Sequence, residues 1–150
     1  MKEAIGNAFI VNFIIVFTVI FIALFVGSLA YTKALRIKNR ITDIIEEHQG
    51  YDTQNQEIQE EINTYLKDAG YRISNVDARD CQLKGQDKYT VVFPGQTTSG
   101  DYDYCIFEFE TPKGKYYGVK TYMYLDLPII GDKIKIGVYG ETKIMGILGT

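Results

Sequence analysis

A long stretch without charge near the amino terminus most constrains this chain of 150 residues. No Asp, Glu, Lys or Arg occurs from Ala4 to Thr32, and residues 8–31 read AFIVNFIIVFTVIFIALFVGSLAY. As a helix this segment would be about 36 Å long, enough to cross the roughly 30 Å of hydrocarbon in a bilayer. A cleaved signal peptide competes, because Ser28 and Ala30 fit a small-x-small cleavage site, but its apolar part is usually about 7 to 15 residues long. We therefore expect residues 1–32 to stay as a transmembrane segment.

The rest of the composition argues against several classes of function. From Ile41 onward the chain has 11 Lys and Arg against 18 Asp and Glu, a balance of −7. Such a surface gives no cationic field for a phosphate backbone, so we expect no nucleic-acid partner. One His, two Cys and no Trp leave no cluster for zinc and no choice of catalytic triad. We therefore expect no enzyme, no cofactor and no metal.

Two kinds of surface are expected on the transmembrane helix. A phenylalanine recurs at every fourth position, which places these rings on one side of the helix, facing lipid: Phe9, Phe13, Phe17, Phe21 and Phe25. Small or polar residues in the same helix favour packing against another helix, namely Asn12, Thr18, Ala23 and Gly27. We therefore expect the lipid bilayer and other helices as partners.

The helical pattern continues beyond the membrane. An apolar stripe at helical spacing follows, made of Leu35, Ile37, Ile41, Ile44 and Ile45. No Gly or Pro lies between Ser28 and Gly50, so we predict one helix over residues 5–48, with residues 33–50 as its extension. A second amphipathic helix is predicted over residues 53–69, from Ile58, Ile62, Tyr65 and Leu66, with Gly70 as its stop. It would cover the stripe only in part, so part of the stripe is expected to contact another subunit.

From Tyr71 onward the pattern changes to a period of two, typical of strands. Strands are predicted at residues 87–93, 102–111, 115–127 and 133–144, which makes residues 51–150 an α+β head domain. A hairpin tip of Pro112, Lys113 and Gly114 would pair Thr111 with Lys115, Phe109 with Tyr117, Phe107 with Val119 and Cys105 with Thr121. One face would then be apolar, with Cys105, Phe107, Phe109, Val119, Thr121, Met123 and Leu125, and the second helix would cover it. The other face would hold Tyr104, Ile106, Glu108, Glu110, Lys120, Tyr122 and Tyr124.

Few residues of the head suggest chemistry. Asp101 and Asp103 lack the ligand spacing of a calcium loop, and His48 is expected at a helix end. Glu108 and Glu110 point the same way on one strand, which favours cross-strand charge pairs with lysines over acid–base catalysis. Eight of the twelve tyrosines lie from Tyr89 onward. They either form a contact surface, with Tyr104, Tyr122 and Tyr124, or are ordinary strand composition.

The orientation in the membrane has evidence on both sides. Four basic residues follow the apolar segment, Lys33, Arg36, Lys38 and Arg40, and the positive-inside tendency would keep them in the cytoplasm. Two cysteines in a small β domain, Cys81 and Cys105, instead favour an oxidising compartment and a disulfide between them. We expect a single-pass protein with its head outside the cell.

The whole architecture resembles the minor pilins and pseudopilins of the type IV filament superfamily, most closely the TadE-like proteins of tight-adherence pili. The resemblance depends on FIVNFIIVFTVIFIALFVGSLAYTKALRIKNRI and on LDLPIIGDKIKIGVYGETKI. Gly6 could precede a prepilin-peptidase cleavage, but Val11 stands at the fifth position after it, where major pilins have Glu. The resemblance implies a structural subunit whose N-terminal helices pack together in a membrane or filament while the heads face outward.

Two functions from different classes follow. The first is a non-enzymatic, membrane-anchored minor pilin-like subunit of a surface pilus or its assembly machinery, with other pilin-like proteins as partners. The alternative is a bitopic accessory module that binds a ligand through its β domain and enters no filament. Only the first requires neighbours that share the same kind of N-terminal helix.

Overall fold

A computed structural model describes residues 2–52, 54–69, 81–85, 88–93, 104–125 and 134–146 of the chain. Its elements are α1 (Lys2–Glu47), α2 (Gln56–Asp68), β1 (Thr90–Phe93), β2 (Tyr104–Thr111), β3 (Gly114–Leu125) and β4 (Ile134–Glu141). The strands form one antiparallel sheet in the order β1-β2-β3-β4. The fold is therefore α+β, with a long N-terminal helix, a second helix and a four-stranded sheet, as the sequence predicts.

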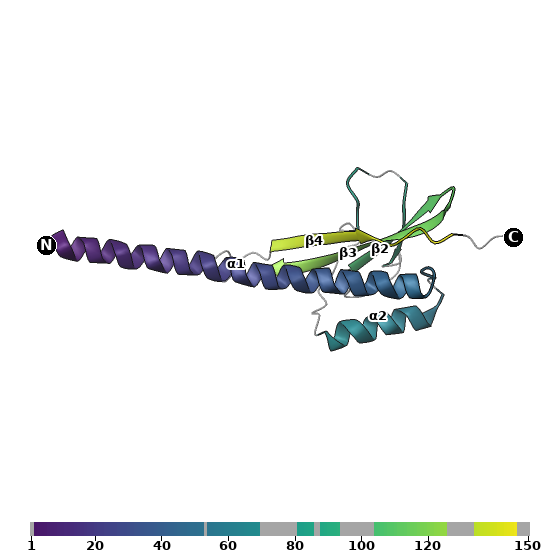
Figure 1. Ribbon diagram of the computed structural model, residues 1–150, viewed down its shortest axis with the longest axis horizontal. Coiled ribbons are helices and arrows are strands. Elements are labelled where there is room, and N and C mark those ends of the chain that lie inside the picture. Colours follow the sequence, from purple (N-terminus) through teal and green to yellow (C-terminus); the bar gives the residue numbers. More distant parts are fainter. Residues whose placement is uncertain are drawn as a thin grey trace.

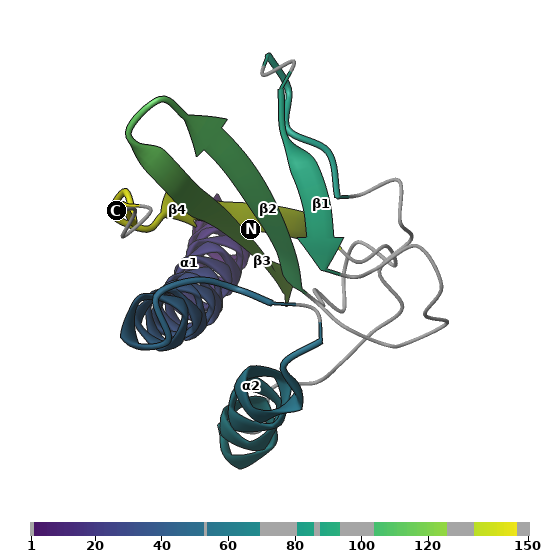
Figure 2. The ribbon, with the colours of Figure 1, turned by 90° about the vertical axis from the view of Figure 1, so that its right-hand side faces the viewer.

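The long helix joins the two parts of the molecule. The first half of α1 extends away from the rest of the protein, and its second half lies between the sheet and α2 (Figures 1 and 2). Within the described elements α1 contacts β3, β4 and α2. One rigid element thus runs from the apolar segment into the centre of the head.

Local sequence explains where both helices end. The backbone leaves the helical conformation at Gln49 and Gly50, which have φ angles of 54° and 146°, and the Gly50 amide donates to the Ile45 carbonyl oxygen over 3.0 Å. This confirms the predicted end near residue 48. The N-cap of α2 is Asn55, whose side chain accepts a hydrogen bond from the Glu57 amide. The predicted stop of α2 at Gly70 lies outside the described residues.

The β2–β3 hairpin differs from the prediction by one residue. Thr111 pairs with Gly114 and Glu110 with Lys115, so the tip holds only Pro112 and Lys113. Proline at the second position of a turn and glycine at the fourth are typical of a type I β-turn. Gly114 also has a φ of 140°, and a Cβ there would overlap the carbonyl oxygen of Met145. The predicted register, with Phe107 opposite Val119 and Cys105 opposite Thr121, is therefore wrong.

This shift changes which residues share a face of the sheet. The face toward α1 carries Tyr104 and Ile106 of β2 together with Val119 and Thr121 of β3. The prediction had instead placed Val119 and Thr121 on the same face as Cys105 and Phe107. On the opposite face Cys105, Phe107 and Phe109 form a second buried cluster with Cys81 and Tyr122. Each face of the sheet thus carries a buried apolar cluster. The expected cover was α2, but α1 lies on the sheet and α2 packs on α1.

The stripe on α1 forms the centre of the head. Ile41, Ile44 and Ile45 have no exposed surface and Ile37 only 1%, because α2 and the sheet enclose them. The expectation that this part of the stripe contacts another subunit is therefore wrong. Leu35 is half-buried and packs beside Ala34 and Val138. The core of the head thus begins within α1, before the predicted domain boundary at residue 51.

Candidate functional site

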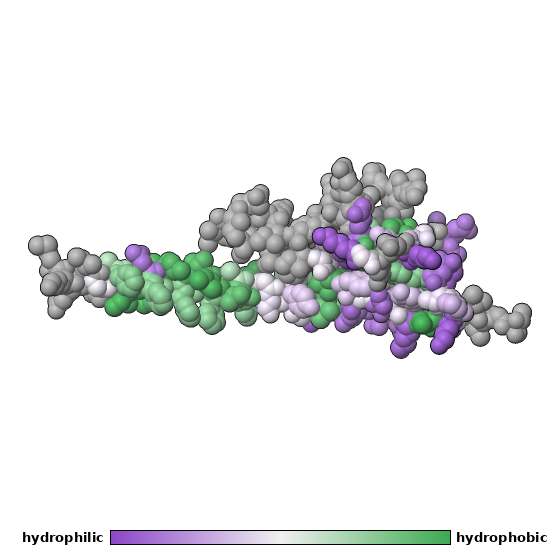
Figure 3. Space-filling view, turned by 90° about the horizontal axis from the view of Figure 1, so that it is seen from above, coloured by the Kyte–Doolittle hydropathy of each residue, from purple (hydrophilic) through white to green (hydrophobic). Residues whose placement is uncertain are grey.

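The first feature with a functional meaning is the apolar segment of α1, residues 8–31, which extends away from the head and which we call the free half of α1. Side chains around its whole circumference are exposed, with Phe9 at 72%, Leu24 at 68% and Phe17 at 55%. It forms a continuous apolar surface, which Figure 3 shows in green beside the hydrophilic head. This is the one helix in the described part of the chain that is long and apolar enough to cross a membrane.

The residues expected to pack against other helices lie on this free half. Asn12 is exposed, and Ala23 and Gly27 are half-buried. Thr18 turns its hydroxyl back to its own helix and donates to the Ile14 carbonyl oxygen over 2.8 Å. Asn12, Ala23 and Gly27 thus stay predictions as packing residues.

The predicted tyrosine contact surface is wrong for two of its three members. Tyr104 is fully buried on the α1 side, where its ring stacks on Phe93 at a centroid distance of 4.6 Å. Tyr122 is 4% exposed on the opposite face, with its hydroxyl 3.9 Å from Cys105 Sγ. The one-residue shift in register separates them. The side chain of Tyr124 lies outside the described residues.

A disulfide joins Cys81 to Cys105, as predicted. The two Cα atoms are 5.7 Å apart and 24 positions apart in sequence. Both residues are buried in the second cluster, where the Tyr89 and Phe107 rings also pack in a T-shaped arrangement. The bond therefore fastens the segment before β1 to the outer face of the sheet.

The acidic pair on β2 belongs to a charge cluster in which one member, Glu108, is half-buried. Lys115 Nζ lies 2.9 Å from Glu108 Oε1 and 3.4 Å from Glu110 Oε1, which confirms the predicted cross-strand pairs. The Glu108 side chain is only 18% exposed, and it also accepts a hydrogen bond from the Tyr117 hydroxyl over 3.0 Å. Both carboxylates raise the pKa of Lys115, with Glu108 the stronger cause. Glu108, Glu110, Lys115 and Tyr117 thus form one charged and hydrogen-bonded cluster across β2 and β3.

His48 takes part in a network between the two helices. Its Nε2 lies 3.1 Å from Glu61 Oε2, and the other oxygen of Glu61 accepts from Arg40 over 3.2 Å. Arg40 also lies 3.5 Å from Glu47. The network joins the end of α1 to α2, so His48 takes part in holding the two helices together.

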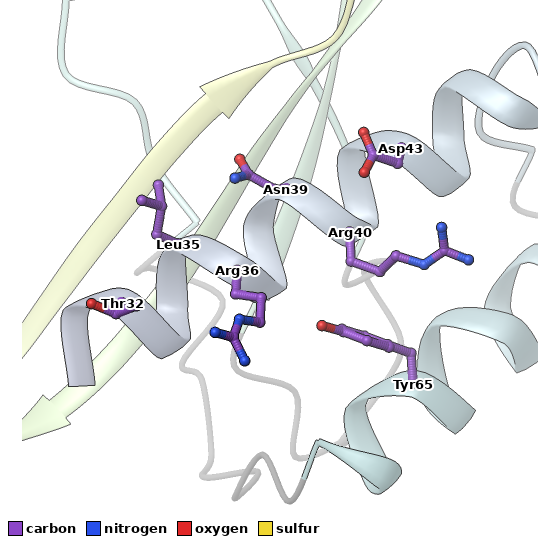
Figure 4. Close-up of a pocket in the computed structure, with 7 residues that line it drawn as sticks. All are labelled: Thr32, Leu35, Arg36, Asn39, Arg40, Asp43 and Tyr65. Carbon is purple, nitrogen blue, oxygen red and sulfur yellow. The ribbon is translucent and has the colours of Figure 1, made fainter. Parts of the chain in front are cut away.

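An open groove lies between α1 and α2 at the end of the head nearer the apolar segment. We call it the α1/α2 groove; its volume is about 390 Å³. Six lining residues come from successive turns of α1 and one from α2: Thr32, Leu35, Arg36, Asn39, Arg40, Asp43 and Tyr65. Figure 4 shows the Arg36 and Arg40 side chains extending toward α2, with the Tyr65 ring directed toward α1. Sequence reasoning missed this site, because it depends on how α2 docks on α1.

The described residues contain no group of three or more His, Cys, Asp or Glu side chains that could hold a metal ion. Asp101 and Asp103, considered above for calcium, lie outside the described residues. Comparison with models of protein families, with curated proteins and with solved structures finds no match for this chain.

Proposed function

We propose that this protein is a non-enzymatic, membrane-anchored minor pilin-like subunit of a surface pilus or of its assembly machinery. The observation that carries the proposal is the single helix α1, of 46 residues. Its first half is free and apolar on all sides, and its second half is the centre of an α+β head (Figure 1). A helix held rigidly by a head and left bare over its apolar half is suited to pack with similar helices in a membrane or filament.

The free half of α1 supplies the assembly surface in this proposal. Asn12, Ala23 and Gly27 are the residues at which helices could approach closely. The buried isoleucines of the stripe are not part of it, because the head itself covers them. Assembly variants must therefore be placed before residue 32, where they leave the core of the head intact.

We propose that the head lies outside the cell. The disulfide supports this, because disulfides persist in oxidising compartments. Two of the four basic residues that argue for the cytoplasm have roles in the head. Lys38 lies across Gly140 of β4, where an added Cβ would be 2.6 Å from its Nζ, and Arg40 pairs with Glu47 and Glu61. Packing of the head thus accounts for part of the basic run.

Co-purification in mild detergent tests the proposal. The wild-type protein should carry other single-span pilin-like proteins with it, and Gly27→Leu should reduce their recovery because the new side chain separates the helices. Val26→Leu, one position away, is the matched control and should have no effect. A wild-type protein that purifies as a lone monomer would favour the accessory-module function instead.

A further inference from the structure

We propose that the α1/α2 groove binds the phosphodiester of a membrane phospholipid, with the Arg36 guanidinium and the Tyr65 hydroxyl as its donors. This inference depends on the membrane anchoring in the proposed function and not on assembly into a pilus. Its basis is the charge, the hydrogen bonding and the position of the groove.

Arg36 is the cation that the groove offers to a ligand. Its side chain is exposed, and it makes no ion pair or hydrogen bond with the described part of the chain. Arg40, one turn further along, already pairs with Glu61 and Glu47 at 3.2 and 3.5 Å. The planar guanidinium of Arg36 presents paired N–H donors, a geometry that matches two phosphate oxygens.

Tyr65 supplies a second donor from the other helix. Its ring is half-buried and packs against the core of the head, while its hydroxyl is directed toward α1 in Figure 4. No hydrogen bond joins this hydroxyl to the described residues. The groove thus presents a charged donor from α1 and a neutral donor from α2 to one ligand.

The position of the groove matches the headgroup layer of a bilayer. Thr32 is the last residue of the charge-free stretch and also the first lining residue of the groove. Arg36 lies about 6 Å further along the helix axis, and the headgroup layer is roughly 5 to 8 Å thick on each side of the hydrocarbon. Leu35 and Thr32 line the end of the groove nearer the membrane, where the glycerol and acyl chains of a lipid would lie.

Charge further along the groove favours a lipid over a free anion. Asp43 lines its far end without an ion pair in the described residues, and the carboxylates of Glu47 and Glu61 surround Arg40. A dissolved phosphate therefore meets little net attraction. A lipid headgroup is already held at the membrane surface, so its effective concentration beside Arg36 is high.

Native mass spectrometry of the full-length protein in detergent micelles tests the proposal with dioleoyl phosphatidylglycerol as the probe. The wild-type protein should retain this lipid, Arg36→Gln should weaken retention about tenfold, and Tyr65→Phe about fivefold. Lys33→Gln is the matched control, because Lys33 is an exposed cation nearer the membrane and outside the lining of the groove. It should change retention less than twofold. Neither dioleoylglycerol, which lacks phosphate, nor glycerol 3-phosphate at the same concentration should bind.

Three results would overturn the proposal: equal loss in Lys33→Gln and Arg36→Gln, equal retention of dioleoylglycerol, or equal binding of glycerol 3-phosphate. Extraction of membranes with alkaline carbonate separates this failure from failure of the proposed function. A wild-type protein that leaves the membrane refutes the anchoring and the lipid site together. A protein that stays in the membrane, but whose lipid retention does not depend on Arg36 or Tyr65, refutes the lipid site alone.

Discussion

Thr121 Oγ1 donates a hydrogen bond of 3.0 Å to the main-chain carbonyl oxygen of Ala34, and both residues are buried. The bond joins β3 to α1 two residues after the end of the charge-free stretch. It therefore fastens the helix to the sheet at the point where α1 enters the head.

Thr121→Val should lower the free energy of unfolding by about 1 kcal/mol. Valine has nearly the same shape, so the change removes the hydrogen bond with little change in packing. Urea unfolding of the full-length protein in mild detergent measures the loss. Thr90→Val, at an exposed position on β1, is the control and should be close to neutral. Equal values for the two variants would show that the bond to Ala34 contributes nothing.

The two glutamates of β2 should differ when each is replaced by glutamine. Glu108 is partly buried and holds both Lys115 and the Tyr117 hydroxyl, whereas the Glu110 side chain is 76% exposed. We expect Glu110→Gln to cost well under 1 kcal/mol, as exposed ion pairs do. Glu108→Gln should cost about 1 to 2 kcal/mol, because it weakens a charge-assisted hydrogen bond that is partly shielded from water. Urea unfolding compares the two variants, and an equal cost would mean that burial of Glu108 has no energetic consequence.

The sequence predicts the helices well because their signals are local. The spacing of Ile58, Ile62 and Leu66 predicts the buried face of α2, and the absence of Gly and Pro up to Gly50 predicts the length of α1. The helical spacing of the apolar stripe also predicts that Ile41 and Ile44 are buried. That spacing does not tell whether the residues that cover the stripe belong to this chain or to another subunit.

The hairpin register and the groove could not be predicted in the same way. The segment TPKGK permits a tip of two or of three residues, and a change of one residue moves every side chain of β3 to the other face. The shorter tip is favoured by the approach of Met145 to Gly114, a contact between distant segments. Arg36 and Tyr65 likewise line one groove only because α2 docks beside α1, and the spacing of neither helix contains that information.

Reduction of the disulfide should destabilise the head. In the chain-entropy model a loop closed over the 24 positions from Cys81 to Cys105 contributes about 3 kcal/mol. Urea unfolding with and without dithiothreitol in mild detergent measures this difference. The Cys81→Ala/Cys105→Ala variant is the control and should not respond to the reductant. An unchanged unfolding midpoint in the wild-type protein would contradict the predicted contribution.

Alkaline pH should destabilise the head through Tyr139. Burial is the main cause that raises the pKa of its hydroxyl, and the hydrogen bond to Glu141, 2.8 Å long, acts in the same direction. The folded state then retains a proton that the unfolded state releases near its ordinary pKa of 10.0. The contribution is fully present below that pH and is lost as the pH rises further.

Tyr139→Phe should reduce this loss, because phenylalanine has no proton to release. Urea unfolding at pH 8 and at pH values above about 10 should show a smaller decrease for the variant than for the wild-type protein. Tyr31→Phe, in the exposed part of α1, should leave the decrease unchanged. Equal decreases in all three proteins would exclude Tyr139 as a cause.

Gly118 lies beneath the ring of Tyr139 on the outer face of the sheet. A Cβ at this position would be 2.8 Å from Cε2 of that ring, too close for two carbon atoms, and the ring is rigid. Gly118→Ala must therefore displace the Tyr139 ring and weaken its hydrogen bond to Glu141. We expect a loss of about 1 to 3 kcal/mol in the free energy of unfolding.

Gly137→Ala is the matched control in the same sheet. Its Cβ would first meet Cε of the flexible Lys120 side chain at 3.0 Å, and the nearest ring atom, Cε1 of Tyr122, would be 3.3 Å away, so the cost should be smaller than at Gly118. Combining Gly118→Ala with Tyr139→Leu, which removes the ring, tests the mechanism directly. If the ring causes the destabilisation, Gly118→Ala should cost little in the Tyr139→Leu background, and the double-mutant cycle should give a coupling of about 1 kcal/mol or more. Additive costs would instead place the effect of Gly118 in the backbone of β3.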